Sequence, residues 1–140
     1  MVYPWTKKVK GSILKQPKIY FFDTACIPAE QPAARFENLV ACSLLKHQQF
    51  REDSLGIKGA LHYLRDKRGA EADFLLVERS KPQMMIECKL SAGESANFST
   101  FASLMPVERP VLLVRQQERN LSYETWDQKS AADWLVKLDA

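Results

Sequence analysis

The sequence predicts an α/β domain with a mixed central sheet flanked by helices. Three observations predict it. The chain has 140 residues, which is long enough for one domain with a hydrophobic core. Apolar residues recur at helical spacing near residues 32–46 and alternate in a hairpin pattern over 71–90. A continuous apolar run at 110–115 is typical of a strand buried on both faces.

The first half of the chain predicts an extended segment and a long helix. Residues 18–23 (KIYFFD) are aromatic and predict a strand or an extended segment. Pro32 is suited to the first turn of a helix over residues 32–46, whose buried stripe is Phe36, Leu39, Val40 and Leu44. Residues 51–59 are polar, contain two glycines and predict a loop.

The second half predicts a three-stranded meander followed by a crossover. Strands are expected at 60–65, 71–78 and 83–90. A short helix at 96–104 should end before Pro106, and the strand at 110–115 should follow it. Because a helix crosses before that strand, the strand is expected to join the sheet parallel to a neighbour. The amphipathic tail 129–138 (KSAADWLVKL) predicts a closing helix.

Charge is distributed unevenly along the chain. The formal net charge is +3, yet residues 1–18 contain no acid and five lysines: Lys7, Lys8, Lys10, Lys15 and Lys18. We therefore divide the chain into a basic N-terminal arm, residues 1–18, and a single domain, residues 19–140. The arm is able to contact phosphates, while a solvated lead-in segment explains the same composition.

The hairpin register predicts a pair of acids. If the residue numbers of each cross-strand pair add to 160, Phe74 faces Ile86 and one face of the hairpin is wholly apolar. The other face then carries Asp73 opposite Glu87, with α-carbons about 5 Å apart, and Lys89 beside them. Two opposed carboxylates repel each other and need a compensating charge.

A divalent cation is one such compensation. Mg²⁺ prefers oxygen ligands and is commonly held by one or two carboxylates plus a substrate phosphate. Lys89 could orient or help deprotonate the attacking water, and Glu37 on the first helix could supply a third carboxylate. Two alternatives stay open. Lys89 alone could neutralise both acids as a surface cluster, and the spacing allows Glu37 to face solvent equally well.

Four segments carry a resemblance to a known family. KQPKIYFFDTAC, RFENLVACSLL, HYLRDKRGAEADFLL and MIECKLS occur in order between about residues 15 and 105. Together they resemble the PD-(D/E)XK nuclease superfamily, and within it the domain of unknown function found C-terminal to prokaryotic AAA+ ATPases. The resemblance implies a restriction-endonuclease-like core (α-β-β-β-α-β).

The resemblance also implies a site. Asp73 and Glu87 would hold Mg²⁺ or Mn²⁺, Lys89 would assist, and Glu37 matches the helical glutamate of the motif set. Tyr63 and Arg65 match a Tyr-aromatic-Arg strand motif, although Leu64 stands where an aromatic residue is usual. The superfamily's proline is replaced by alanine at position 72, which removes no ligand.

Three functions follow as hypotheses. The first is a Mg²⁺-dependent nuclease that hydrolyses DNA phosphodiester bonds, with DNA contacts from Arg65, Tyr63, Lys7, Lys8 and Lys10. The second is a catalytically silent module that binds DNA or a partner protein, either an AAA+ ATPase portion or a homologous chain. The third is an α/β domain whose acids form a surface cluster.

The sequence also predicts what the chain lacks. No GxxxxGK[ST] loop is present, so we expect no ATP binding or hydrolysis by this chain. No apolar run reaches the roughly 20 residues that cross a bilayer, and the start lacks a secretory signal. We therefore expect a cytoplasmic protein with no membrane contact. The scattered cysteines and histidines do not form a zinc motif.

Overall fold

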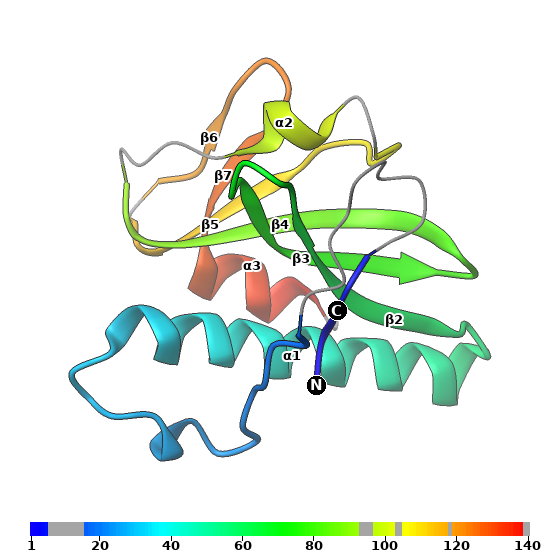
Figure 1. Ribbon diagram of the computed structural model, residues 1–140, viewed down its shortest axis with the longest axis horizontal. Helices are drawn as coiled ribbons and strands as arrows, with labels where there is room; N and C mark the ends of the chain where they lie inside the picture. Colours follow the sequence, from blue (N-terminus) through cyan, green and yellow to red (C-terminus); the bar gives the residue numbers. More distant parts are fainter. Residues whose placement is uncertain (6–15, 93–96, 103–104, 118, 139–140) are drawn as a thin grey trace.

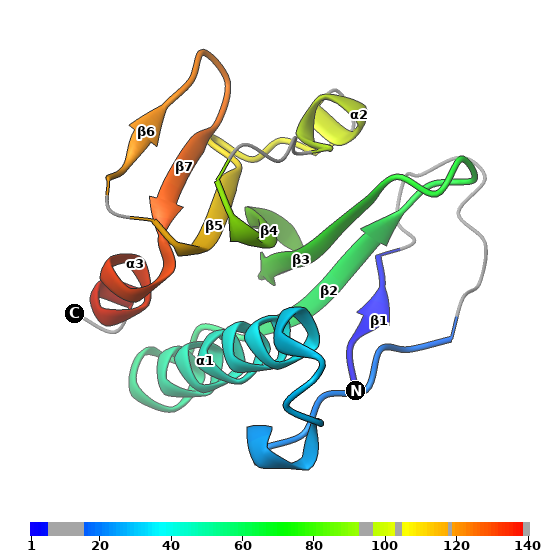
Figure 2. The same cartoon turned by 90° about the vertical axis from the view of Figure 1, so that its left-hand side faces the viewer.

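A sheet of seven strands forms the centre of the domain, with helices on both faces (Figures 1 and 2). The computed structural model describes residues 1–5, 16–92, 97–102, 105–117 and 119–138. The strands are β1 (Tyr3–Pro4), β2 (Gly59–Arg65), β3 (Glu71–Glu78), β4 (Lys81–Ser91), β5 (Val111–Gln116), β6 (Leu121–Ser122) and β7 (Asp127–Ser130). The helices are α1 (Pro32–Leu55), α2 (Phe98–Ala102) and α3 (Ala131–Leu138), with a 3₁₀ turn η1 (Thr24–Cys26).

The strand order confirms the predicted mixed α/β architecture. The order is β1-β2-β3-β4-β5-β7-β6, with β2, β3 and β4 antiparallel and β5 parallel to β4. The sequence did not indicate β1, β6 or β7. β1 pairs with β2 in parallel, so the first residues of the chain form one edge of the sheet. β7 is parallel to β5, and β6 lies antiparallel at the opposite edge.

Each face of the sheet has its own hydrophobic core. On one face, α1 and α3 pack on β3, β4 and β5 through a cluster that includes Phe36, Leu44, Phe74 and Ile86. On the other face, Phe98 and Phe101 of α2 cover a cluster that includes Leu75, Met85 and Leu112. We call these the α1 face and the α2 face.

The β3–β4 register confirms the predicted sum. The pairs Phe74↔Ile86, Leu75↔Met85 and Leu76↔Met84 each add to 160. The register shifts after Leu76, and the chain reverses at Arg79 and Ser80, which both have positive φ angles of 48° and 66°. Strand β4 therefore begins at Lys81, two residues before the predicted start.

Helix α1 is longer than the sequence predicted. It continues through residues 47–55, so the prediction of a loop over 51–59 is wrong for the part before Gly56. The extra turns have tertiary partners: Gln48 is buried, and Arg51 forms an ion pair with Glu78 at the end of β3 (Nε to Oε1, 2.6 Å). Gly56 ends the helix in the left-handed conformation (φ 65°), which glycine adopts without steric cost.

The remaining elements differ in their bounds. The closing helix begins at Ala131, because Lys129 and Ser130 belong to β7. Helix α2 covers 98–102, and the flanking residues 96, 103 and 104 of the predicted helix lie outside the described residues. Within the described part of the chain, no helix is long and apolar enough to cross a membrane.

The contact between α1 and the start of β2 generates a prediction. A β-carbon added to Gly59 would overlap the amide group of the buried Gln48 side chain, closer than real contacts permit. We therefore expect Gly59→Ala to lower the free energy of unfolding by about 1–3 kcal/mol through overpacking, measured by urea denaturation. In a Gln48→Ala background the same change should cost much less. Equal losses in both backgrounds would contradict the packing explanation.

Candidate functional site

A β-bulge in β3 determines where the Asp73 side chain points. Between the pairs His62↔Leu75 and Leu64↔Ala72, β2 advances by two residues and β3 by three. The extra residue interrupts the alternation of side chains, so that Ala72 packs in the core of the α2 face while Phe74 packs on the α1 face. Asp73 lies in this irregular stretch, and its ionic partners are on the α1 side.

Asp73 also lies where β3 and β4 stop pairing. The described ladder ends at Phe74↔Ile86, and the next contact is between the Asp73 side chain and the β4 backbone. The amide of Cys88 donates to Asp73 Oδ2 at 2.8 Å. Burial, and then the negative charge of Glu37, raise the pKa of Asp73 to about 7, against the opposing effect of Lys18.

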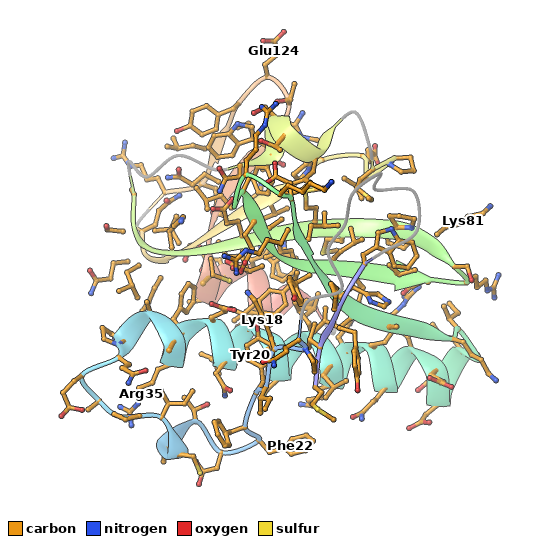
Figure 3. The ribbon with its side chains drawn as sticks, viewed as in Figure 1. Lys18, Tyr20, Phe22, Arg35, Lys81 and Glu124 are labelled. Carbon is orange, nitrogen blue, oxygen red and sulfur yellow. The ribbon has the colours of Figure 1, made fainter. Side chains whose placement is uncertain are left out.

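Lys18 is the cation of this region. Its Nζ lies 3.1 Å from Glu37 Oε1 and 3.5 Å from Asp73 Oδ1, and it also forms an ion pair with Glu71. We call Glu37, Glu71, Asp73 and Lys18 the Lys18 cluster. Figure 3 shows Lys18 and Tyr20 between α1 and the sheet. Burial disfavours the charged ammonium, but the carboxylates outweigh this effect and raise the pKa of Lys18.

Two tyrosines complete the surroundings of the Lys18 cluster. The Tyr20 hydroxyl donates to Glu37 Oε1 at 2.5 Å, and burial together with Glu37 raises the pKa of Tyr20. The Lys18 ammonium lies over the ring of Tyr63, 5.2 Å from its centroid, in a cation–π contact. The Tyr63 hydroxyl donates to the carbonyl of Gln16 at 3.0 Å. Tyr20 therefore helps to fix the position of Glu37, and Tyr63 that of Lys18.

Glu87 and Lys89 form a separate pair. Glu87 is 3% exposed, and Lys89 Nζ lies 3.2 Å from its Oε1. The amide of Asn97, next to α2, donates to Glu87 Oε2 at 2.9 Å. The partner of Glu87 in β5 is Leu112, which packs in the core of the α2 face. The Glu87 carboxylate thus has its partners on the α2 face, the face of Leu75 and Met85. The sequence predicted this face for both Glu87 and Asp73, and the structure bears it out for Glu87 alone.

The structure brings together some of the predicted site residues and separates others. Glu37 faces the sheet and joins Asp73 through Lys18, while Glu87 and Lys89 lie on the other side. The expected Asp73–Glu87 pair on one face is therefore not formed, and the prediction was wrong because the bulge reverses Asp73. Among the described residues, no group of three or more acidic, histidine or cysteine side chains is arranged to hold a metal ion.

The donor set accordingly does not match a magnesium site. Mg²⁺ requires near-octahedral oxygen ligation, and the carboxylates of Glu37, Glu71 and Asp73 surround an ammonium group instead. The ammonium of Lys18 supplies one positive charge to these three acids, and Arg65 supplies a second to Glu71. In this arrangement the side chains position and neutralise one another, and we derive no hydrolytic step from them.

The residues predicted to contact nucleic acid lie in two different environments or outside the described residues. Tyr63 is buried and contacts Lys18 and Gln16, so its ring and hydroxyl are already in use. Arg65 is partly exposed and pairs with Glu71 (NH1 to Oε2, 3.5 Å). Lys7, Lys8 and Lys10 lie outside the described residues.

The sequence analysis missed Lys18, Tyr20 and Glu71 as site residues. Lys18 was assigned to the basic arm, and the aromatic segment after it was treated only as extended structure. One signal was available for Glu71, which precedes Asp73 by two residues and therefore shares its face in a regular strand. No local pattern indicates that Lys18 reaches Glu37, because that contact depends on the path of the chain between them.

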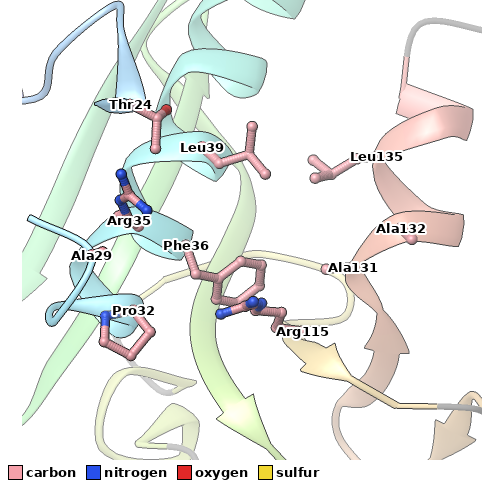
Figure 4. A pocket seen from close by; sticks show the side chains of 10 residues that line it. All are labelled: Thr24, Ala29, Pro32, Arg35, Phe36, Leu39, Arg115, Ala131, Ala132 and Leu135. Carbon is pink, nitrogen blue, oxygen red and sulfur yellow. The ribbon is translucent and has the colours of Figure 1, made fainter. Parts of the chain in front are cut away.

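A cavity between α1 and α3 is separate from the Lys18 cluster and from the Glu87–Lys89 pair. It has a volume of about 470 Å³ and is lined mainly by apolar side chains, together with Arg35 and Arg115 (Figure 4). Phe36 and Leu135 line it from the two helices. No carboxylate is among the described residues that line it, so its chemistry differs from that of the predicted hydrolytic site.

Comparison with known proteins identifies the family. The model of a domain of unknown function, DUF4143, matches residues 33–133, which is well over half of the chain. The chain therefore belongs to the DUF4143 family. No curated protein and no solved structure matches the chain. The matched range of this DUF4143 domain begins inside α1, so it includes Glu37, Asp73, Glu87 and Lys89 but not Lys18.

The hydrogen bond between Asp73 and Cys88 generates a prediction for this DUF4143 domain. Asp73→Ala leaves the Cys88 amide without its acceptor, whereas Asp73→Asn keeps an acceptor oxygen. Both substitutions remove the same charge, so their difference isolates the hydrogen bond and the shape of the side chain. We expect the alanine variant to be less stable than the asparagine variant by about 1–3 kcal/mol in urea denaturation. Equal stabilities would show that this bond contributes little.

Proposed function

We propose that this DUF4143 domain is a restriction-endonuclease-like module that binds a partner and does not cut nucleic acid. The order α1, β2, β3, β4, α2, β5 agrees with the core that the sequence resemblance implies. Three described strands outside this core, β1, β6 and β7, extend the sheet, and the helix α3 extends its cover. The agreement supports the superfamily assignment, and the side chains support the absence of cleavage.

One observation carries the proposal: the Lys18 ammonium lies among the acids that a nuclease would use to bind a metal. Glu37 and Asp73 both lie within 3.5 Å of Lys18 Nζ. Glu87, the remaining acid of the set, is paired with Lys89 on the α2 face. Each acid of the predicted metal site thus has a lysine of the same chain as its counter-ion.

An exposed apolar surface favours a protein as the partner. Phe22 is 88% exposed, and Figure 3 shows its side chain at the edge of the molecule, away from the sheet. A groove of about 340 Å³ lies beside it, lined by Tyr3, Phe21, Phe22 and Leu45 among others. Contiguous exposed apolar surface marks protein interaction sites more often than nucleic-acid sites, which are positively charged. The resemblance to domains that follow AAA+ ATPases makes an ATPase portion or a homologous chain the candidate partner.

A Mg²⁺-dependent nuclease is the second candidate, and one observation favours it. The Asp73 side chain accepts a hydrogen bond from the backbone amide of Cys88, the residue between Glu87 and Lys89. Asp73 on the α1 face is therefore attached to the residue that directly follows Glu87, whose side chain points to the α2 face. A rearrangement at this end of the hairpin would be needed to bring their carboxylates to one metal ion.

A cleavage assay separates the two candidates. We expect no cleavage when the purified chain is incubated with linear, circular and branched DNA in the presence of Mg²⁺ or Mn²⁺, analysed on gels. Asp73→Ala and Glu87→Gln serve as controls for contaminating nucleases. Cleavage by the natural sequence that both substitutions abolish would contradict the proposal and establish the nuclease.

The apolar surface gives a second test. If a homologous chain is the partner, light scattering should show a mass that rises with protein concentration in EDTA, because burial of Phe22 requires no metal. Phe22→Ser should lower the association, while Phe50→Ser, at another exposed phenylalanine (54%), should not. A monomer at all concentrations would exclude the homologous chain. A gel shift with DNA in EDTA that both variants retain would instead indicate a nucleic-acid partner.

A further inference from the structure

The segment that carries Lys18 crosses the α1 face as a strap. We use this name for residues 16–23, which connect the β1 edge of the sheet to the 3₁₀ turn before α1. The backbone groups of Lys18 and Val2 donate to each other at 2.8 Å in both directions. These two bonds attach the first half of the strap to the edge strand.

The second half of the strap is attached independently to α1. The amide of Phe21 donates to Asn38 Oδ1, and Asn38 Nδ2 donates to the carbonyl of Phe21, both at 2.8 Å. Asn38 is 1% exposed, so this reciprocal pair is shielded from water. The backbone of Lys18 thus forms the first anchor and that of Phe21 the second, and the Lys18 side chain adds a third attachment through the Lys18 cluster.

We propose that Lys18 is an internal counter-ion that locks the strap over its carboxylates, so that the seated strap and a divalent cation at those carboxylates exclude each other. The inference rests on the proposed function, because it gives the reason why the carboxylates do not act as a metal site. It assigns to the strap the role of a competitor, built into the fold, for these carboxylates.

The positions of the charged groups argue for this exclusion. The Lys18 Nζ lies within 3.5 Å of carboxylate oxygens from α1 and from β3, so it fills the space where these acids converge. Among the described residues, the positively charged groups that pair with these acids are Lys18 and, on the outer oxygen of Glu71, Arg65. A divalent cation at the point of convergence would lie within a few ångströms of the ammonium, where like charges repel strongly.

The coupling is reciprocal because it is an equilibrium property. If the seated Lys18 weakens the binding of a cation by some factor, the cation weakens the seating of Lys18 by the same factor. Couplings between sites commonly amount to about 5- to 150-fold in affinity. Since Asn38 holds Phe21 separately, the release should affect residues near Lys18 and leave the Phe21 attachment intact.

The first test measures Mn²⁺ binding by calorimetric titration at constant pH. The natural sequence should bind at least about tenfold more weakly than Lys18→Met, which removes the ammonium but keeps an unbranched side chain. Lys18→Arg retains the positive charge and should bind as weakly as the natural sequence. Adding Asp73→Asn to Lys18→Met should abolish the gain. Equal affinities of the natural sequence and Lys18→Met would overturn the proposal.

The second test needs no substitution and remains available if Lys18→Met does not fold. In hydrogen exchange of the natural sequence, millimolar Mn²⁺ should speed the exchange of the Lys18 and Val2 amides, because the strap is displaced. The Phe21 amide, held by Asn38, is the internal control and should not change. If Mn²⁺ binds and the Lys18 and Val2 amides do not respond, metal and strap are compatible and the proposal is wrong.

These results are distinguishable from those that test the proposed function. DNA cleavage by the natural sequence would contradict a silent module whatever Lys18 does. The counter-ion role is measured by Mn²⁺ affinity and amide exchange, neither of which requires a nucleic acid or a protein partner. A Mn²⁺ site that appears on removal of Lys18, in a chain that still does not cleave DNA, would support both inferences.

Discussion

The need to neutralise acids that are partly or fully buried at one end of the β3–β4 hairpin connects the parts of this structure. Two strands that stop pairing leave backbone amides and carboxylates near each other in a region of restricted access to water. An uncompensated charge there would be costly, so each acid requires a donor or a cation. Asp73 has both, because it accepts from the Cys88 amide and lies beside the Lys18 ammonium.

This requirement explains why the beginning of the chain is part of the domain. Lys18 can reach the acids only if the strap crosses the α1 face, and the strap is positioned by its bonds to Val2 and by the Tyr63 hydroxyl. β1 in turn is fixed by parallel pairing with β2. The edge strand, the strap and the carboxylates therefore form one connected unit. Removal of any of these attachments should change the position of Lys18 relative to the acids, although the acids themselves belong to α1 and β3.

The sequence predicted those features that depend on neighbouring residues. The hairpin register followed from apolar matching, because a slip of one residue would have placed Glu87 beside Phe74. The start of α1 followed from Pro32, and the parallel β5 from the crossover helix. The helical spacing of Glu37 did not determine whether its side chain points to the sheet or to solvent. Tertiary packing determines that it points to Lys18.

The features that the sequence could not predict depend on irregular pairing or on distant contacts. The bulge in β3 arises from pairing with β2, so the sequence of β3 and β4 alone gave no sign that Asp73 would reverse. The extra turns of α1 are stabilised by Arg51 with Glu78 and by the buried Gln48, neither of which marks a helix locally. β1 has only two residues, too few to show a period.

The reversal of Asp73 changes what the same set of residues can do. With Asp73 and Glu87 on one face, two carboxylates would share one lysine and retain an excess of negative charge that favours a divalent cation. With the two acids on opposite faces, Lys18 serves Glu37 and Asp73, and Lys89 serves Glu87. Each of these acids then lies within ion-pair distance of a lysine of the chain itself, and Lys18 is shared with Glu71 as well. A set of motif residues can thus be complete in sequence and still be divided in space, and the division follows from one extra residue in a strand.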